Sequence, residues 1–161
     1  MGSPLGRYAG DVDDTLVTVV LLDVPLLVWK RAAEHHDELM REMSLLALAP
    51  DPPELPARLT ELVQVLGQRY GAAGARPDDA RDEALAAGKD RIDLTYEVPR
   101  SAGQAGAAMR ALLDEAEEYC KAELLTLQQP ELEAAFGRWY IDQFVQQCQG
   151  NPPTPWPGPW A

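Results

Sequence analysis

The sequence predicts an α+β fold that is predominantly helical, with four long helices in a bundle-like layer and a small two-stranded sheet. Three observations lead to this prediction. Four long segments carry apolar residues at the three-and-four spacing of an amphipathic helix, and two short segments look like strands. Prolines stand at the junctions between these segments.

The first predicted strand covers residues 15–22, TLVTVVLL, which are apolar and rich in β-branched side chains. We expect this strand to be buried on both faces. The sequence Asp-Val-Pro at 23–25 ends it, and Pro25 suits the first turn of a helix, where a missing N–H costs nothing. A helix over about 26–47 follows, with one apolar stripe and one charged face.

A proline-rich break at 50–56 separates this helix from a second one over about 55–71, which ends at Gly71. Residues 72–90 are charged and rich in alanine and glycine, and they contain few residues that could form a core. We predict a surface connection there, with a short helix that begins at Pro77.

The clearest strand signal lies at 92–98, where apolar and polar residues alternate. Glu-Val-Pro at 97–99 ends this strand, and Ser101 can cap a third helix over about 102–124. A fourth helix is predicted over about 131–148, after a break that ends at Pro130.

The predicted organisation is a flexible acidic lead-in at 1–14, a single helical domain at 15–150, and a tail of proline and tryptophan at 151–161. Within the domain, the order strand, acidic-Val-Pro, long helix, proline break and helix occurs twice, in the halves 15–71 and 91–149. A β-α-α pseudo-repeat would pair the two strands and place the four helices in one layer. The alternative is chance, because acidic-Val-Pro is a generic joint between a strand and a helix.

The net charge of −12 argues against binding to nucleic acid or to an anionic membrane surface. The longest apolar run, Leu16 to Val28, is too short and too interrupted to span a bilayer, and the N-terminus does not have the pattern of a secretory signal. Two cysteines, Cys120 and Cys148, are too few for a disulfide scaffold. We therefore expect a cytoplasmic protein.

The two cysteines are also predicted to stay unpaired. If the third and fourth helices form an antiparallel hairpin, Cys120 and Cys148 lie about 21 Å apart along the helix axes. A disulfide needs Cα atoms within about 7 Å. We expect both to be buried thiols.

The densest polar cluster, Glu-His-His-Asp-Glu at 34–38, lies on the first long helix. His36 falls on the apolar stripe, which favours a hydrogen-bonded core histidine, whereas His35 is expected to face solvent. The alternative is a ligand pocket near Trp29, His35 and His36. No metal site is predicted, because the Glu-x-x-His pairs of bundle di-metal centres do not occur.

The sequence offers little support for catalysis. None of the three serines lies in a Gly-x-Ser-x-Gly turn, no glycine-rich phosphate loop follows a strand, and Cys120 lies on an apolar helix stripe. We therefore predict no catalytic residue and no cofactor, and we favour a protein that is not an enzyme.

Two features suggest a protein partner. Asp114, Glu115, Glu117 and Glu118 form either the solvated face of the third helix or an acidic docking surface. The tail has five prolines within eight residues and carries Trp156 and Trp160. These tryptophans either fold back onto the domain or form a stiff ligand for a partner groove.

The segments EHHDELMREMSLLAL, DLTYEVP, LLDEAEEYC, RWYIDQFV and PWPGPW resemble a set of small, poorly characterised helical proteins of actinobacteria. These proteins are associated with partner-switching modules, which combine anti-sigma-type kinases, STAS-domain antagonists and PP2C-type phosphatases. The resemblance covers about residues 15–160, and it implies a protein partner such as a sigma-factor regulator. It assigns no functional residue.

The function favoured by the sequence is that of a non-enzymatic regulatory or adaptor protein that acts by protein–protein interaction, and the resemblance implies sigma-factor partner switching as its setting. The alternative is a small-molecule-binding or metal-dependent helical enzyme with a pocket near His35 and His36. A homodimeric structural unit is a third possibility.

Overall fold

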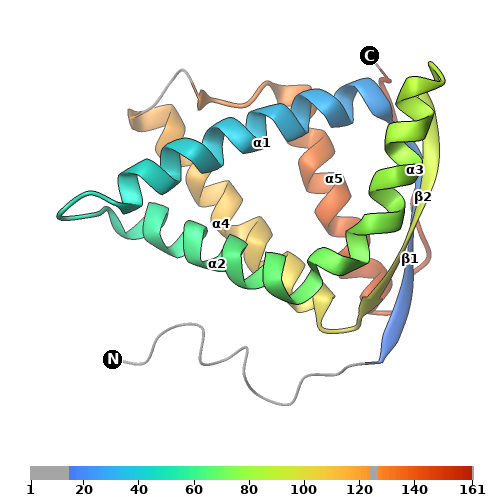
Figure 1. The fold of residues 1–161 in the computed structure, drawn as a ribbon, viewed down its shortest axis with the longest axis horizontal. Helices are drawn as coiled ribbons and strands as arrows, with labels where there is room; N and C mark the ends of the chain where they lie inside the picture. Colours follow the sequence, from blue (N-terminus) through green and yellow to red (C-terminus); the bar gives the residue numbers. More distant parts are fainter. Residues whose placement is uncertain (1–14, 124–126, 161) are drawn as a thin grey trace.

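The apolar periodicity of the sequence becomes helices and strands in the order predicted, as the computed structural model in Figure 1 shows. The structure describes residues 15–123 and 127–160, so the predicted lead-in at 1–14 lies outside it. The fold is α+β and mostly helical, as predicted. Its elements are β1 (Leu16–Pro25), α1 (Leu26–Ala47), α2 (Glu54–Tyr70), the 3-10 helix η2 (Gly71–Gly74), α3 (Ala75–Ala86), β2 (Arg91–Pro99), α4 (Ala102–Glu123) and α5 (Glu131–Cys148). None of the described helices is both long and apolar enough to cross a membrane.

The two strands pair antiparallel, with Leu16 opposite Pro99 and Leu21 opposite Leu94. A bulge shifts the register between Leu21 and Val24. At this bulge Asp23 has a φ of 56°, and its N–H donates to Oδ1 of Asp93 at 2.9 Å. The expectation that β1 ends before Asp23 is therefore wrong, because the bulge accommodates the acidic residue and pairing resumes beyond it.

The faces of β1 differ in burial. Val19 and Leu21 are fully buried, whereas Val20 and Leu22 are half-buried and Leu16 is 65% exposed. The prediction of burial on both faces is thus wrong. The side chains of Val19 and Leu21 lie in one core cluster with aromatic residues of α5.

The outer edge of β1 is closed by a side chain in place of a third strand. The buried Gln147 amide accepts a hydrogen bond from Val20 N–H at 2.9 Å and donates to the Val20 carbonyl at 2.8 Å. Two residues further along β1, the backbone N–H of Trp156 donates to the Leu22 carbonyl at 3.0 Å. The backbone groups of Val20 and Leu22 that point away from β2 thereby find partners.

The C-terminal tail folds back onto the domain. Trp156 is 4% exposed, with its ring centre 5.7 Å from that of Phe136 and 5.5 Å from that of Trp139. The indole N–H of Trp139 donates to the Thr154 carbonyl at 3.1 Å. Trp160 is 38% exposed, and the Arg91 guanidinium lies 5.1 Å from its ring centre.

The four long helices form a closed ring, in which α1 and α4 each contact both α2 and α5. This pattern of neighbours is the one expected of two β-α-α halves related by a pseudo-two-fold axis. The segment between the halves departs from it, because α3 packs against β2 with Pro77 and Ala84 buried. The Arg81 guanidinium of α3 also lies 3.6 Å from the ring centre of Trp29. Most residues of 72–90 are exposed, as expected of a surface connection, and Pro77 and Ala84 add a small buried contact against β2.

The core has two parts. One joins the sheet, α5 and Trp156, and the other joins α2 to the C-terminal part of α1 and to α4.

Two glycines let α4 approach α5 closely at one end of the hairpin that these two helices form. A Cβ on Gly103 would lie 2.7 Å from Cβ of Cys148, and one on Gly106 would lie 3.4 Å from a methyl group of Val145.

Replacing Trp156 tests the anchoring of the tail. Trp156→Ala empties a buried aromatic position, so we expect it to lower the free energy of unfolding by about 3–5 kcal/mol in chemical denaturation. Trp160→Ala removes a partly exposed ring and should have a clearly smaller effect. Equal effects of the two variants would contradict the structure.

Replacing Gly103 tests the close approach of α4 and α5. Gly103→Ala forces the backbones apart, because Cβ of Cys148 cannot rotate away, and we expect a loss of about 1–3 kcal/mol in stability. Gly67→Ala, in the interior of α2, meets no atom within 4 Å and should raise stability by about 0.5–1 kcal/mol. Thermal unfolding of both variants measures the difference, and a stabilised Gly103→Ala would refute the contact.

Candidate functional site

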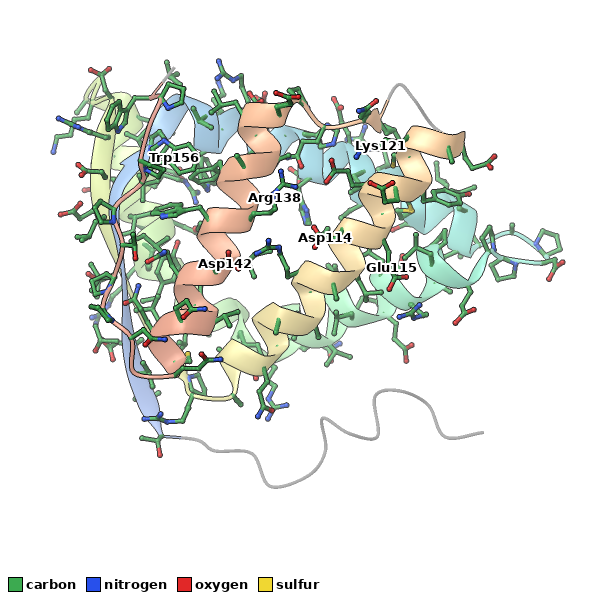
Figure 2. The ribbon with its side chains drawn as sticks, turned by 180° about the vertical axis from the view of Figure 1, so that it is seen from behind. Asp114, Glu115, Lys121, Arg138, Asp142 and Trp156 are labelled. Carbon is green, nitrogen blue, oxygen red and sulfur yellow. The ribbon has the colours of Figure 1, made fainter. Side chains whose placement is uncertain are left out.

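A cavity of about 410 Å³ lies between α1, α4 and α5. It separates the two parts of the core, since Phe136 on its wall belongs to one part and Leu39 and Ala116 belong to the other. Figure 2 shows its origin: α4 and α5 meet near the beginning of β1 and diverge toward Lys121. The glycine contact fixes the narrow end of this hairpin, and the cavity occupies the wide end.

Ion pairs bridge the two diverging helices. Arg138 of α5 pairs with Glu117 of α4, with 3.2 Å between Nη1 and Oε2. The other oxygen of Glu117 lies 3.2 Å from Nζ of Lys121. Arg110 of α4 pairs with Asp142 of α5, and its Nε lies 3.6 Å from Asp114. The charged groups that span the wide end therefore already have partners of opposite charge.

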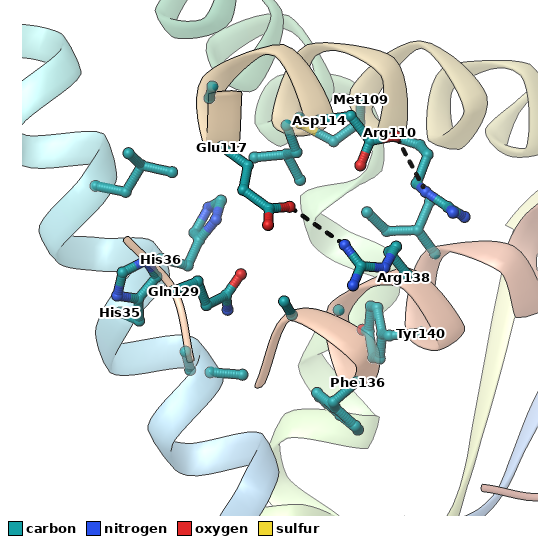
Figure 3. Close-up of a pocket in the computed structure, with 18 of the residues that line it drawn as sticks. His35, His36, Met109, Arg110, Asp114, Glu117, Gln129, Phe136, Arg138 and Tyr140 are labelled. Atoms are coloured by element: carbon teal, nitrogen blue, oxygen red, sulfur yellow. Dashed lines mark hydrogen bonds and ion pairs between the residues drawn. The ribbon is translucent and has the colours of Figure 1, made fainter. Parts of the chain in front are cut away.

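Imidazole and amide side chains occupy another side of the cavity. Figure 3 shows His35 and His36 of α1 together with Gln129, across from the pair of Glu117 and Arg138. His36 and Gln129 are half-buried, and neither hydrogen-bonds to another described residue. Each side chain carries both donor and acceptor capacity. The cavity wall thus contains polar groups that form no hydrogen bond to the other described residues.

His36 is tuned toward its neutral form. Burial lowers the pKa of His36 below its ordinary value of 6.5, and the nearby His35 lowers it further, while the carboxylate of Asp37 opposes the shift. The imidazole is therefore neutral near pH 7, with one nitrogen that donates and one that accepts. The structure corrects the expectation of a hydrogen-bonded core histidine, because α1 does not pack against another element at this position and leaves the cavity there.

Aromatic and aliphatic side chains form the rest of the wall. They include Trp29, Leu39, Met109, Leu113, Phe136, Tyr140 and Ile141. The Tyr140 hydroxyl donates to that of Tyr96 at 3.0 Å, and burial raises the pKa of Tyr140 well above 10, so it stays neutral. A second space of about 360 Å³ lies beyond it, between η2, β2, α4 and α5, and shares Met109, Tyr140 and Ile141 with the first.

Trp29, His35 and His36, which the sequence grouped as a possible pocket, all line the cavity. Sequence reasoning missed Arg138, which lies opposite them, and Gln129, which lies beside them. Arg138 follows two residues after Phe136 on the flank of the apolar stripe of α5, and a charge at such a flank was the available signal. Gln129 lies outside the helices, so no periodicity pointed to it.

The residues considered for partner binding are placed differently. Glu115 pairs with Arg58 of α2 at 3.3 Å, and Glu118 pairs with Lys121 at 2.9 Å. Asp114 and Glu117 face the cavity, as Figures 2 and 3 show for Asp114. Ion pairs within the protein therefore partly neutralise the predicted acidic surface. Trp156 is buried, so in this structure it does not present its ring to a partner.

Both cysteines are buried free thiols, as predicted. Burial raises the pKa of both thiols, so neither is activated as a nucleophile, although Cys120 borders the cavity. Within the described ranges, no group of three or more histidine, cysteine, aspartate or glutamate side chains is placed to hold a metal ion.

Comparisons of this chain with protein-family models, with curated proteins and with solved structures find no match.

The tuning of His36 predicts a pH dependence of stability. Because its folded pKa lies below the unfolded value near 6.5, the unfolded chain takes up the proton first. The contribution of His36 to stability is therefore complete above pH 6.5 and is lost as the pH falls through the lowered folded pKa. Urea denaturation from pH 7 to 5 should show this loss, and the loss should be smaller in His36→Gln.

NMR titration of the His36 ring checks the cause. We expect the pKa of His36 below 6.5 in the native protein, still lower in Asp37→Asn, and higher in His35→Gln. A value at or above 6.5 in the native protein would show that the imidazole is not desolvated.

Proposed function

We propose that this protein binds a small molecule in the cavity between α1, α4 and α5. The observation that carries the proposal is the combination of about 410 Å³ of space with the polar groups of His36 and Gln129, which have no partner among the described residues. Ligand pockets have volumes of about 300–1,000 Å³, mostly apolar walls and a few polar groups that orient the ligand.

The cost of the cavity supports this proposal. The apolar side chains that face the cavity make fewer packing contacts than they would in a closed core, and an apolar ligand surface would supply these contacts. A polar group on the ligand would also hydrogen-bond to His36 and Gln129. The ion pair between Glu117 and Arg138 holds the wide end of the α4–α5 hairpin apart, so the space exists before a ligand arrives.

The regulatory or adaptor function remains a second proposal, because the net charge of −12 and the resemblance to partner-switching proteins support it. The internal ion pairs of Glu115 and Glu118 weaken an acidic docking surface on α4. A ligand-binding domain and a regulatory protein are compatible, since a small molecule in the cavity could set the spacing of the helices.

Filling the cavity tests ligand binding. Gly137 lines the space, and a Cβ built on it meets no atom within 4 Å, so we expect the side chain of Gly137→Leu to occupy part of the cavity. Gly67→Leu is the matched control, because it makes the same change in the interior of α2 at a position where a Cβ is equally free. A library of small molecules is screened against the native protein by thermal shift, and hits are verified by NMR.

We expect hits that raise the melting temperature of the native protein and of Gly67→Leu but not that of Gly137→Leu. Hits that act equally on all three proteins would place the binding site elsewhere. A library and a metabolite extract that both yield no hit would refute the proposal.

A further inference from the structure

The charges around the cavity restrict the chemistry of its ligand. Arg138 pairs with Glu117, and Arg110 pairs with Asp114 and Asp142, so among the described residues of the wall no guanidinium is free to neutralise an anion. Both oxygens of Glu117 likewise have cationic partners, in Arg138 and Lys121. Asp37, a further carboxylate among the described lining residues, is exposed to solvent.

A charged ligand would therefore lose its hydration without gaining a new partner inside the cavity. Burial of an unpaired charge costs several kcal/mol, whereas burial of a neutral polar group costs little when it is hydrogen-bonded. The ion pairs of the wall would also have to open to receive it. The electrostatics thus disfavour carboxylates, phosphates and amines alike.

The polar groups without partners favour an uncharged ligand that can form hydrogen bonds. The neutral imidazole of His36 offers one donor and one acceptor, and the amide of Gln129 offers two donors and one acceptor. Both side chains lie on the same side of the cavity (Figure 3). A carboxamide or lactam presents a carbonyl acceptor and an N–H donor side by side, without charge, and so matches these groups.

The apolar side chains of the wall indicate that the larger part of the ligand is an aromatic ring system. Trp29, Phe136 and Tyr140 supply aromatic surface, and aromatic rings gain from edge and offset contacts with other rings. Arg81 already covers one face of Trp29, so that face does not serve a cationic ligand.

On the basis of the proposed function, we infer that the ligand is an uncharged aromatic or heteroaromatic molecule with an amide-type polar edge, which hydrogen-bonds to His36 and Gln129 while its ring packs against Phe136 and Tyr140.

Three probes with one ring system and different charges test this inference: indole-3-acetamide, indole-3-acetate and tryptamine, which are neutral, anionic and cationic at pH 7. Their dissociation constants are measured by NMR titration at millimolar concentrations against the native protein, Gly67→Leu and Gly137→Leu. We expect the amide to bind at least about tenfold more tightly than either charged probe. We also expect this binding to be lost in Gly137→Leu.

A pair of neighbouring variants tests the hydrogen bonds. Gln129→Ala should weaken binding of the acetamide by about three- to tenfold, because one hydrogen bond is lost. Gln128→Ala should not change it, because Gln128 is exposed and does not line the cavity. His36→Leu, which keeps an apolar group of similar size at the wall, should weaken binding to a similar degree as Gln129→Ala.

The outcomes separate this inference from the proposed function. If the acetate or the amine binds to the cavity as tightly as the amide, the inference is wrong and the proposed function stands. If none of the three probes binds in a way that Gly137→Leu abolishes, the inference is also wrong, and the library screen decides the proposed function. Equal binding to Gln129→Ala and the native protein would refute the assigned hydrogen bonds.

Discussion

The pairing of β1 with β2 is the interaction on which the rest of the molecule depends, because it joins the two halves of the chain. A two-stranded sheet on its own is marginally stable in water, so its edge and one face must be covered. The Gln147 amide closes the outer edge of β1, and the rings of α5 and Trp156 cover the face that carries Val19 and Leu21. The sheet thus holds α5 and the tail in place, and they in turn make the sheet stable.

The way α5 is held against the sheet also explains the cavity. The C-terminal end of α5 must lie against β1, and Gly103 lets α4 approach that end of α5 closely. The two helices then diverge, and α1 closes the wide end without filling it. Charged side chains of Arg138 and Glu117 bridge the gap where apolar ones would have collapsed into it. The hollow is therefore a consequence of how three helices are anchored, and its polar wall keeps it open.

Much of the fold could be predicted from the sequence because it follows from local periodicity. The bounds of α1 and α5 match their apolar stripes and the prolines that precede them. The structure departs from prediction where a distant residue decides the outcome: Asp93 supports the bulge at Asp23, and Trp29 gives Arg81 of α3 a partner. For the candidate site, the pattern at 34–38 identified one wall only. The opposite wall depends on the angle between α4 and α5, which a helical repeat does not encode.

The position of Trp156 within the core sets the order in which the molecule can be made and assembled. β1 is synthesised before the other described helices and strands, but the ring that completes its core cluster follows more than a hundred residues later. At about 5–20 residues per second, translation leaves the apolar face of β1 without its final cover for roughly 7–26 s. During that interval the α1–α2 hairpin can form from local contacts, and β1 can pair with β2 once residue 99 has been made, but the core cluster stays incomplete. Assembly of this domain is therefore completed only after translation of Trp156.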